Sequence, residues 1–376
     1  MKRAAGIITD RGGQTSHAAI VSRELGVPAV VGTVTATKLL KNNQMVSLNG
    51  ATGEIYEGRP NDETIEKAKL VKVKSVSEPS LTKTRIYVNL GEPDLAENVA
   101  KLNGDGVGLL RAEFMIAQMG IHPRKMLEQG RRKEFVDHMV KNLAKFTHAF
   151  GDRPVVYRAT DFKTNEYKNL KGGEVYEKEE PNPMIGYRGA FRYIHDSAVF
   201  DMELEAIKTV REELGYKNLH LMIPFVRTVD ELVKVKKIVN DAGLRRGPNF
   251  HLWMMVEIPS NVILLEDFIK VGIDGVSIGS NDLTMLILGT DRDNETVASI
   301  YDERNPAVMW AFEKIVKTCK KHEVTCSICG QAPSLYSDLT QKLVEWGATS
   351  VSVSPDAIDR TREIVYHAER LLAKKP

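Results

Sequence analysis

The stretch LWMMVEIP, residues 252–259, contains five consecutive apolar residues before its glutamate. Because so short a run has no polar side to turn toward water, it predicts a strand that is buried on both faces. Seven further short runs follow the same pattern: RIYVNL (85–90), GVGLL (106–110), VVYRA (155–159), LHLMIP (219–224), GVSIGS (275–280), TCSICG (325–330) and SVSVSP (350–355).

Longer segments with helical periodicity separate these runs, for example DELVKVKKIVNDAG (230–243) and NPAVMWAFEKIVKTCKKHE (305–323). Eight apolar runs that alternate with helices over about 290 residues predict an α/β fold, a closed (β/α)8 TIM barrel. A doubly wound open sheet is the alternative that fits the same alternation.

The N-terminal part of the chain has a different character. Residues 1–59 are rich in Gly, Val and Thr, and they predict short strands joined by turns, with one clear helix that starts near His17. Residues 60–82 are charged and polar and predict a linker. The expected organisation is therefore a small domain at 1–59, a linker at 60–82 and the barrel at 83–376.

Bulk composition narrows the function classes. The formal net charge of the 376 residues is +2, which is too small to argue for a nucleic acid or an anionic membrane as partner. The sequence has neither an apolar run long enough to span a membrane nor the apolar core of a signal peptide. Three cysteines do not suggest a disulfide framework, so a cytoplasmic location is expected.

Polar side chains follow the predicted strands where a barrel carries its chemistry, at the C-terminal strand ends. These residues are Arg111, Arg158, Glu257, Asn281, Asp282 and Cys329. The carboxylates of Glu257 and Asp282 suit a hard divalent ion such as Mg2+, although two capping or surface acids would look the same. Arg111 and Arg158 predict a site for a carboxylate or a phosphate, to which Arg188 and Arg292 could add; solvated surface arginines are the alternative.

Cys326 and Cys329 form a C-x-x-C pattern, but residues three apart in a strand point to opposite faces and cannot share one zinc ion. Cys329 stands at the strand end and is the candidate acid or base. It could serve as a base only if a cationic site lowered its pKa. Cys326 and Cys319 are expected to be packed thiols.

The segment GGQTSHAAI (12–20) places a histidine at the start of a predicted helix. A phosphoryl group on His17 would meet free backbone N–H groups and the positive end of the helix dipole. Gly13 allows close approach of the backbone, and the hydroxyls of Thr15 and Ser16 could contact the phosphate or cap the helix. A plain N-cap beside an incidental histidine is the alternative.

Taken in order, the motifs resemble those of the phosphoenolpyruvate (PEP)-utilising enzymes over nearly the whole chain. The matching stretches are GGQTSHAAIVSRELGVPAVVGT (12–33), GVGLLRAEFMI (106–116), VYRATDFKTNEY (156–167), NPMIGYRG (182–189), VEIPSN (256–261), SIGSNDLTMLILGTDRDN (277–294) and CGQAPS (329–334). Within the family, FKTNEY and CGQ favour the branch that forms PEP from ATP, pyruvate and water.

The resemblance implies a role for each candidate residue. His17 would carry the phosphoryl group, with Thr15 and Gly13 in its phosphate loop. Substrate would be held by Arg111, Arg158, Arg188, Arg292, Asn281 and Ser280. Mg2+ would be bound by Glu257 and Asp282, and Cys329 would move the proton on the methyl carbon of pyruvate.

The resemblance also implies partners and departures. Family members carry a longer histidine domain, a swivelling one, preceded by an ATP-grasp domain, so we expect this chain to supply at most the PEP/pyruvate half-reaction. A homo-oligomer formed through the barrel is also expected. Met285 stands where relatives usually have Gln.

Four alternatives remain open at this stage. They are an enzyme I-type phosphocarrier, a pyruvate, phosphate dikinase, a Mg2+-dependent pyruvate aldolase on a similar barrel and a non-catalytic scaffold. An aldolase would have no use for His17, and a scaffold would have no need of the polar strand ends.

Overall fold

The computed structural model describes residues 4–13, 16–60, 81–292, 294 and 296–374. The chain divides into two compact units, residues 1–81 with 290–301 and residues 82–289 with 302–376. The predicted linker at 60–82 lies almost wholly outside the described residues.

The first unit contains short elements: β1 (Ile7–Ile8), α1 (His17–Glu24), β2 (Ala29–Val30), α2 (Ala36–Leu39), β3 (Val46–Asn49) and β4 (Glu54–Glu57). Strand β1 pairs in parallel with β2, and β3 pairs in antiparallel with β4. Segment 290–301, with the short 3-10 helix η3 (Ala298–Ile300), belongs to this unit although it comes late in the sequence.

The second unit is an eight-stranded parallel barrel, so the predicted fold is confirmed. Its strands are β5 (Arg85–Leu90), β6 (Val107–Arg111), β7 (Val155–Arg158), β8 (Leu219–Ile223), β9 (Leu252–Val256), β10 (Gly275–Ile278), β11 (Thr325–Ile328) and β12 (Ser350–Val353). From β5 to β11 each strand pairs with the next one in sequence, and β12 returns to pair with β5. Between β11 and β12, the Thr349 N–H donates to the Cys326 carbonyl at 2.9 Å.

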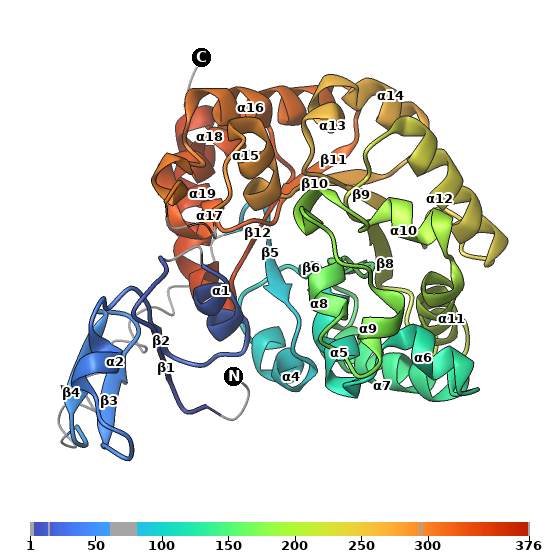
Figure 1. Ribbon diagram of the computed structural model, residues 1–376. Coiled ribbons are helices and arrows are strands. Elements are labelled where there is room, and N and C mark those ends of the chain that lie inside the picture. Colours follow the sequence, from blue (N-terminus) through green and yellow to red (C-terminus); the bar gives the residue numbers. More distant parts are fainter. Residues whose placement is uncertain (1–3, 14–15, 61–80, 293, 295, 375–376) are drawn as a thin grey trace. The chain divides into compact units, whose positions relative to one another are not determined.

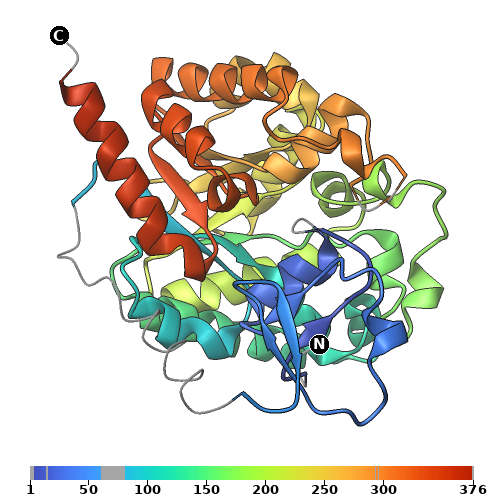
Figure 2. The ribbon, with the colours of Figure 1, turned by 90° about the vertical axis from the view of Figure 1, so that its left-hand side faces the viewer.

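Helices surround the strands (Figure 1). They are α4 (Ala96–Ala100), α5 (Ala112–Met119), α6 (Pro123–Glu128), α7 (Arg132–Phe150), α8 (Thr164–Tyr167), α9 (Gly173–Tyr176), α10 (Ala190–His195), α11 (Ala198–Glu212), α12 (Val229–Asp241), α13 (Pro259–Ile263), α14 (Leu265–Lys270), α15 (Ser280–Leu288), α16 (Pro306–Lys321), α17 (Ala332–Leu335), α18 (Ser337–Trp346) and α19 (Ile358–Ala373). The long red helix α19 packs against α18 (Figure 2).

The two helices expected from periodicity form within two residues of their predicted ends, and local chemistry explains where they start. The Thr228 hydroxyl accepts a hydrogen bond from the Glu231 N–H at 3.1 Å and caps α12. Asn305 caps α16 in the same way, through Ala307 at 3.0 Å, and Pro306 occupies the first helical position.

The barrel strands are buried on both faces, as their uniform apolar character predicted. All five residues of β8 and all five of β9 are buried. One face packs against the helices, while the other fills the barrel with a separate cluster: Leu109, Val156, Met222, Trp253, Met255 and Cys329. The interior is therefore a packed core rather than a channel.

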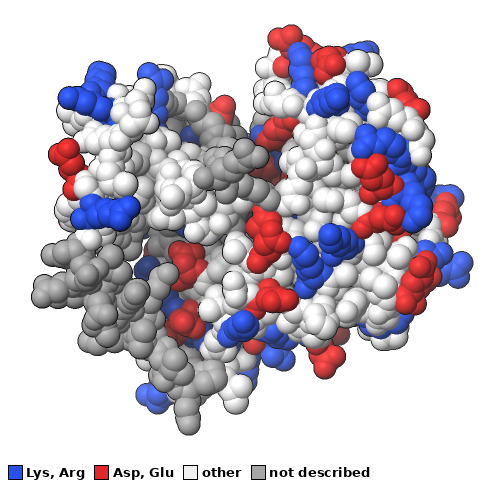
Figure 3. All heavy atoms as spheres, turned by 90° about the horizontal axis from the view of Figure 1, so that it is seen from below, with Lys and Arg blue, Asp and Glu red and all other residues white. Residues whose placement is uncertain are grey.

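The distribution of charged side chains on the surface does not indicate where a functional site lies. Basic and acidic side chains are interspersed on the face drawn in Figure 3. Among the described residues, no helix has both the length and the apolar character that crossing a membrane requires.

Candidate active site

Two arginines lie side by side where β6 and β7 end. Arg111 and Arg158 are the last residues of their strands and are partners in the parallel register. Helix α5 starts directly after Arg111, so the chain turns away at this point and leaves the side chain at the strand end. Two adjacent guanidinium groups suit a carboxylate or a phosphate.

Arg158 is held by acids from the adjoining loops. Its Nη2 donates to Glu113 Oε1 at 2.7 Å, and its Nη1 lies 3.9 Å from Asp161 Oδ2. Burial alone would lower the Arg158 pKa, but the carboxylates of Glu113 and Asp161 outweigh it and raise the pKa well above its usual value. The guanidinium is therefore a fixed, permanently charged group.

Arg188 joins two parts of the site. Its Nε and Nη2 donate to the two oxygens of Asp161 at 3.0 and 2.6 Å, and the same Nη2 donates to Asp282 Oδ2 at 3.0 Å. The guanidinium also lies over the Phe225 ring, 3.9 Å from its centroid. Arg188 is 3% exposed, so it is a buried counter-charge for these acids.

Glu257 directly follows β9 and is 2% exposed. Its Oε1 accepts a hydrogen bond from the Phe225 N–H at 2.7 Å. Burial, followed by the negative charges of Asp282 and Asp161, raises the Glu257 pKa to about 8. A side chain at Gly279 would bring a Cβ to 2.6 Å from Glu257 Oε2, so only glycine leaves room for this carboxylate.

The carboxylates of Glu257 and Asp282 fit a Mg2+ ion. Mutual repulsion helps to raise the Glu257 pKa, and a divalent cation would relieve it. Within the described part of the chain, no group of three or more His, Cys, Asp or Glu side chains could hold a metal ion alone. Mg2+ does not need such a group, because one or two carboxylates with water and substrate oxygens complete its shell.

Residues around Asn281 are fixed by contacts between loops. Asn281 Oδ1 accepts from the Gln331 N–H at 3.4 Å, and the fully buried Ser280 donates through its hydroxyl to Glu303 Oε1 at 2.6 Å. A Cβ on Gly330 would lie 1.7 Å from Ser280 Oγ. The glycine of the CGQ triplet is therefore required for the start of α15 to approach the end of β11.

Cys329 follows β11 and belongs to the barrel interior cluster. Its thiol donates to the Ile278 carbonyl at 3.7 Å. Burial raises the Cys329 pKa to about 11, although Arg158 and Arg111 act in the opposite direction. The cationic site thus does not lower this pKa below its ordinary value, because desolvation outweighs the two arginines, and the group is a neutral thiol at neutral pH.

Cys326 and Cys319 lie in the cluster between barrel and helices, whereas Cys329 faces the interior. The two cysteines of the C-x-x-C pattern are thus on opposite sides of β11. This placement agrees with the geometric argument against a shared zinc ion.

The histidine motif lies in the first unit. His17 is the first residue of α1, and the Ser16 hydroxyl caps the helix by accepting from the Ala19 N–H at 3.4 Å. Gly12 has φ +97°, a conformation that favours glycine. Thr15 lies outside the described residues. Nothing lies within 4 Å of a Cβ built on Gly13.

Arg292, which was expected at the substrate site, lies in segment 290–301 and so belongs to the first unit rather than to the barrel unit. Met285, on α15, is 8% exposed and therefore buried.

Sequence reasoning missed three supporting residues. Glu113 and Asp161 hold Arg158 and Arg188, and Asn89 on β5 donates through Nδ2 to the Cys329 carbonyl at 3.0 Å. A signal exists for Asp161, since it stands three residues after Arg158 in the loop that leaves β7. Asn89 could have been noticed as an amide within an otherwise apolar run.

Two sequence families match the chain. Residues 66–370 match the family described as PEP-utilising enzyme, PEP-binding domain. Residues 1–53 match the family described as PEP-utilising enzyme, mobile domain.

Curated proteins with similar sequences carry one kind of name. A probable phosphoenolpyruvate synthase of Staphylothermus marinus is 48% identical over an alignment that covers 100% of the chain and 46% of that protein. The phosphoenolpyruvate synthase of Aeropyrum pernix is 48% identical, with 98% and 47% covered. That of Helicobacter pylori is 41% identical, with 99% and 48% covered. The chain therefore spans about half the length of the curated relatives it matches.

Proposed function

The chain belongs to the PEP-utilising enzyme family, as its motifs predicted, and we infer from this that its barrel interconverts pyruvate and PEP. We propose that the complete activity is that of a phosphoenolpyruvate synthase, which converts ATP, pyruvate and water to AMP, PEP and phosphate. The names and coverage of the curated relatives support this reading. The residues present would supply the PEP/pyruvate half, with an ATP-grasp domain as the partner for the other half.

The proposed division of labour follows the two matched families. Residues 1–59 form the phosphohistidine domain, 60–82 the linker and 83–376 the substrate barrel. His17 would carry the phosphoryl group, with Thr15 and Gly13 beside it. A homo-oligomer formed through the barrel and a cytoplasmic location complete the proposal; three free cysteines suit a reducing compartment.

Substrate binding is assigned to the arginine pair. Arg111 and Arg158 present adjacent cations at the strand ends, which suits the carboxylate and phosphate of PEP. Asn281, which is fixed by Gln331, and Ser280, whose hydroxyl is held by Glu303, would contact the substrate. Arg292 and Arg188 complete the set, Arg188 chiefly by fixing Asp282.

Glu257 and Asp282 would hold Mg2+ at the same strand ends. When bound, the ion would supply positive charge opposite the enolate oxygen of pyruvate. Glu257 must lose its proton to serve as a ligand, and Arg188 keeps Asp282 oriented. The remaining charge of the enolate would face Arg111 and Arg158.

Cys329 is assigned the proton transfer. In the direction of pyruvate formation, its thiol gives a proton to the methylene carbon of the enolate and becomes a thiolate. In the opposite direction the thiolate takes a proton from the methyl group, and for this the site must first stabilise the thiolate. The pKa of about 11 favours the first role.

One observation carries the proposal: Glu257, Asp282 and Cys329 come after the C-terminal ends of the neighbouring parallel strands β9, β10 and β11, and Arg111 and Arg158 end the neighbouring strands β6 and β7. These groups therefore share one end of one barrel. A site for an enolate needs this combination of a proton donor, fixed cations and metal-binding carboxylates.

The proposal is tested by exchange of the pyruvate methyl protons with deuterium in the presence of Mg2+, followed by NMR. We expect exchange with the unmodified chain and a loss of at least about 100-fold for Cys329→Ser. Cys319→Ala, a change at a buried thiol away from the site, is the matched control. No exchange above the solvent rate, together with no Mg2+-dependent binding of oxalate, would refute the assignment.

The histidine role needs a separate experiment. Labelled PEP and Mg2+ should leave an acid-labile label on the chain, and His17→Ala should abolish it. Two results together would favour an aldolase-like enzyme instead. The unmodified chain would take up no label, and the His17→Ala variant would still exchange the methyl protons of pyruvate.

A further inference from the structure

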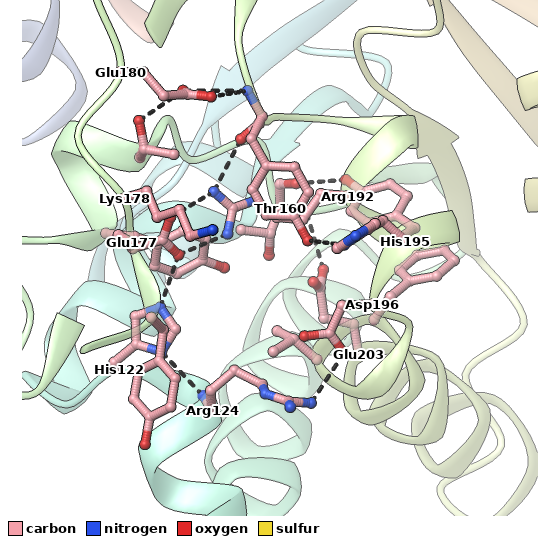
Figure 4. A pocket seen from close by; sticks show the side chains of 17 residues that line it. His122, Arg124, Thr160, Glu177, Lys178, Glu180, Arg192, His195, Asp196 and Glu203 are labelled. Carbon is pink, nitrogen blue, oxygen red and sulfur yellow. Dashed lines mark hydrogen bonds and ion pairs between the residues drawn. The ribbon is translucent and has the colours of Figure 1, made fainter. Parts of the chain in front are cut away.

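A cavity of about 340 Å3 lies apart from the residues assigned to catalysis. Side chains from α6, α8, α9, α10, α11 and the adjoining loops line it (Figure 4). None of the residues proposed to bind substrate or metal contributes to its wall. The volume suits a small organic molecule.

Charged side chains that pair with one another form one wall of the cavity. Arg192 donates to both oxygens of Glu177 at 2.7 and 2.9 Å, and His122 Nε2 lies 3.0 Å from Glu177 Oε1. The Arg192 guanidinium also lies 4.3 Å from the centroid of the Tyr187 ring. This wall is therefore rigid, and its main charges are already paired.

The opposite wall contains an acid whose hydrogen bonding is incomplete. Glu203 is 1% exposed, and its Oε2 accepts from the Tyr157 hydroxyl at 2.6 Å and the Thr160 N–H at 3.0 Å. Its Oε1 is buried and has no hydrogen-bond partner among the described residues. Figure 4 shows Glu203 on the side of the cavity across from Glu177 and His122.

The raised pKa of Glu203 agrees with a carboxylate oxygen that lacks a hydrogen-bond donor. Burial raises its pKa to about 7, against the Tyr157 hydroxyl and against both the hydroxyl and the N–H of Thr160, which lower it. Glu113 raises it further, and the neighbouring Tyr193 and Tyr167 are uncharged at neutral pH. A buried carboxylate oxygen without a donor is costly, and a bound N–H or O–H group would remove that cost.

The remaining surface is largely aromatic. Tyr167, Tyr193 and Phe200 line the cavity and are at most 3% exposed. Arg124 and Lys178 contribute positive charge, with Arg124 paired to Asp196 at 2.9 Å. Aromatic walls favour a flat, apolar body, and the cations already present disfavour an ammonium group.

We propose that this cavity binds a small neutral aromatic molecule that carries an N–H or O–H donor, and that the donor is received by Glu203 Oε1. The proposal does not depend on the reaction assigned to the barrel end. The cavity is nevertheless joined to that end, because Glu203 holds the Thr160 backbone and the next residue, Asp161, holds Arg188.

Indole and 1-methylindole are the probes, since they share a flat body and differ in the N–H group. Titrations with the full chain at pH 8, followed by calorimetry or ligand-observed NMR, should show saturable binding of indole. Binding of 1-methylindole should be at least about tenfold weaker, because it leaves the acceptor unmet. Oxalate with Mg2+ should not displace indole, since it occupies the barrel end.

The Glu203→Gln variant tests whether the preference of the cavity for a hydrogen-bond donor can be reversed. Because Oε2 serves two donors, the Gln amide must place its oxygen there and turn its NH2 group into the cavity. The variant should lose the preference for indole and bind benzofuran, an acceptor, at least as well. Glu205→Gln, an exposed change two residues along α11, should bind as the unmodified chain does.

Equal binding of indole and 1-methylindole, displacement of indole by oxalate with Mg2+, or no saturable binding would each overturn the proposal. If Glu203→Gln fails to fold, a structure of the unmodified chain with indole decides the matter. The indole nitrogen must then lie within hydrogen-bonding distance of Glu203 Oε1.

Discussion

The Nη2 atom of Arg188 lies 3.0 Å from Oδ2 of Asp282. A single buried guanidinium thus orients one carboxylate assigned to the metal, while its other contacts fix Asp161. The acids at this end of the barrel can be concentrated because a permanent cation lies among them.

Arg188→Leu should therefore destabilise the barrel strongly. Removing one partner of a buried ion pair leaves uncompensated charge, so the free energy of unfolding should fall by about 3–5 kcal/mol. Denaturant unfolding followed by tryptophan fluorescence measures this, since Trp253, Trp310 and Trp346 all lie in the barrel unit. Arg132→Leu, which breaks an exposed pair with Glu205, should cost at most about 1 kcal/mol. Similar losses in both variants would contradict the buried role of Arg188.

Mg2+ affinity should rise with pH up to about 8. Glu257 holds a proton below its pKa of about 8, and the ion must displace that proton to use the carboxylate. Calorimetry at pH 7 in buffers of different ionisation enthalpy should show release of close to one proton per Mg2+, and at pH 9.5 almost none. Glu257→Gln should remove the proton release. A proton count that does not change with pH would exclude Glu257 as a ligand.

Glu203 should make the barrel less stable as the pH rises. Its folded-state pKa of about 7 exceeds the ordinary 4.5, so the folded chain holds the proton more tightly than the unfolded chain. The resulting stabilisation is complete below about pH 4.5, declines between pH 4.5 and 7, and amounts to about 3 kcal/mol. Unfolding curves of Glu203→Gln should lack this decline, and those of Glu205→Gln should keep it. If the free energy of unfolding of the unmodified chain and of both variants changed with pH in the same way, burial would not raise this pKa.

Gly330→Ala should weaken PEP binding by moving Ser280 and Asn281. The new Cβ would meet Ser280 Oγ at 1.7 Å, so the start of α15 or the end of β11 must shift. Calorimetric titration with oxalate and Mg2+ should give an affinity lower by at least about tenfold, equivalent to about 1.4 kcal/mol. Gly247→Ala, where nothing lies within 4 Å of the added carbon, is the control. Unchanged oxalate binding in Gly330→Ala would show that the loop tolerates the shift.

The barrel could be predicted because its strands carry their own signal. Runs such as 252–256 are apolar on both faces, and in β6, β7 and β9 the first polar residue at the end of the run marks the strand end. Arg111, Arg158, Glu257 and Cys329 were all recognisable for this reason.

The hydrogen-bond partners of these residues could not be predicted from the sequence in the same way. Glu113 and Asp161 hold arginines through contacts that depend on how two loops fold over the strands. The Cys329 pKa could not be predicted from the sequence either, because burial and nearby cations act in opposite directions and their balance depends on the folded structure. The association of residues 290–301 with the first unit carries no local signal either.

The packed interior beneath Cys329 has a stereochemical consequence. Its sulfur is hydrogen-bonded to the Ile278 carbonyl, and Cys329 belongs to the buried cluster that fills the barrel, so we expect the sulfur to approach a bound enolate from one side only. If the Cys329 thiol is the proton donor, the two faces of the methylene carbon are not equivalent to the protein. Isotopically marked PEP should then yield pyruvate whose methyl group has a single handedness.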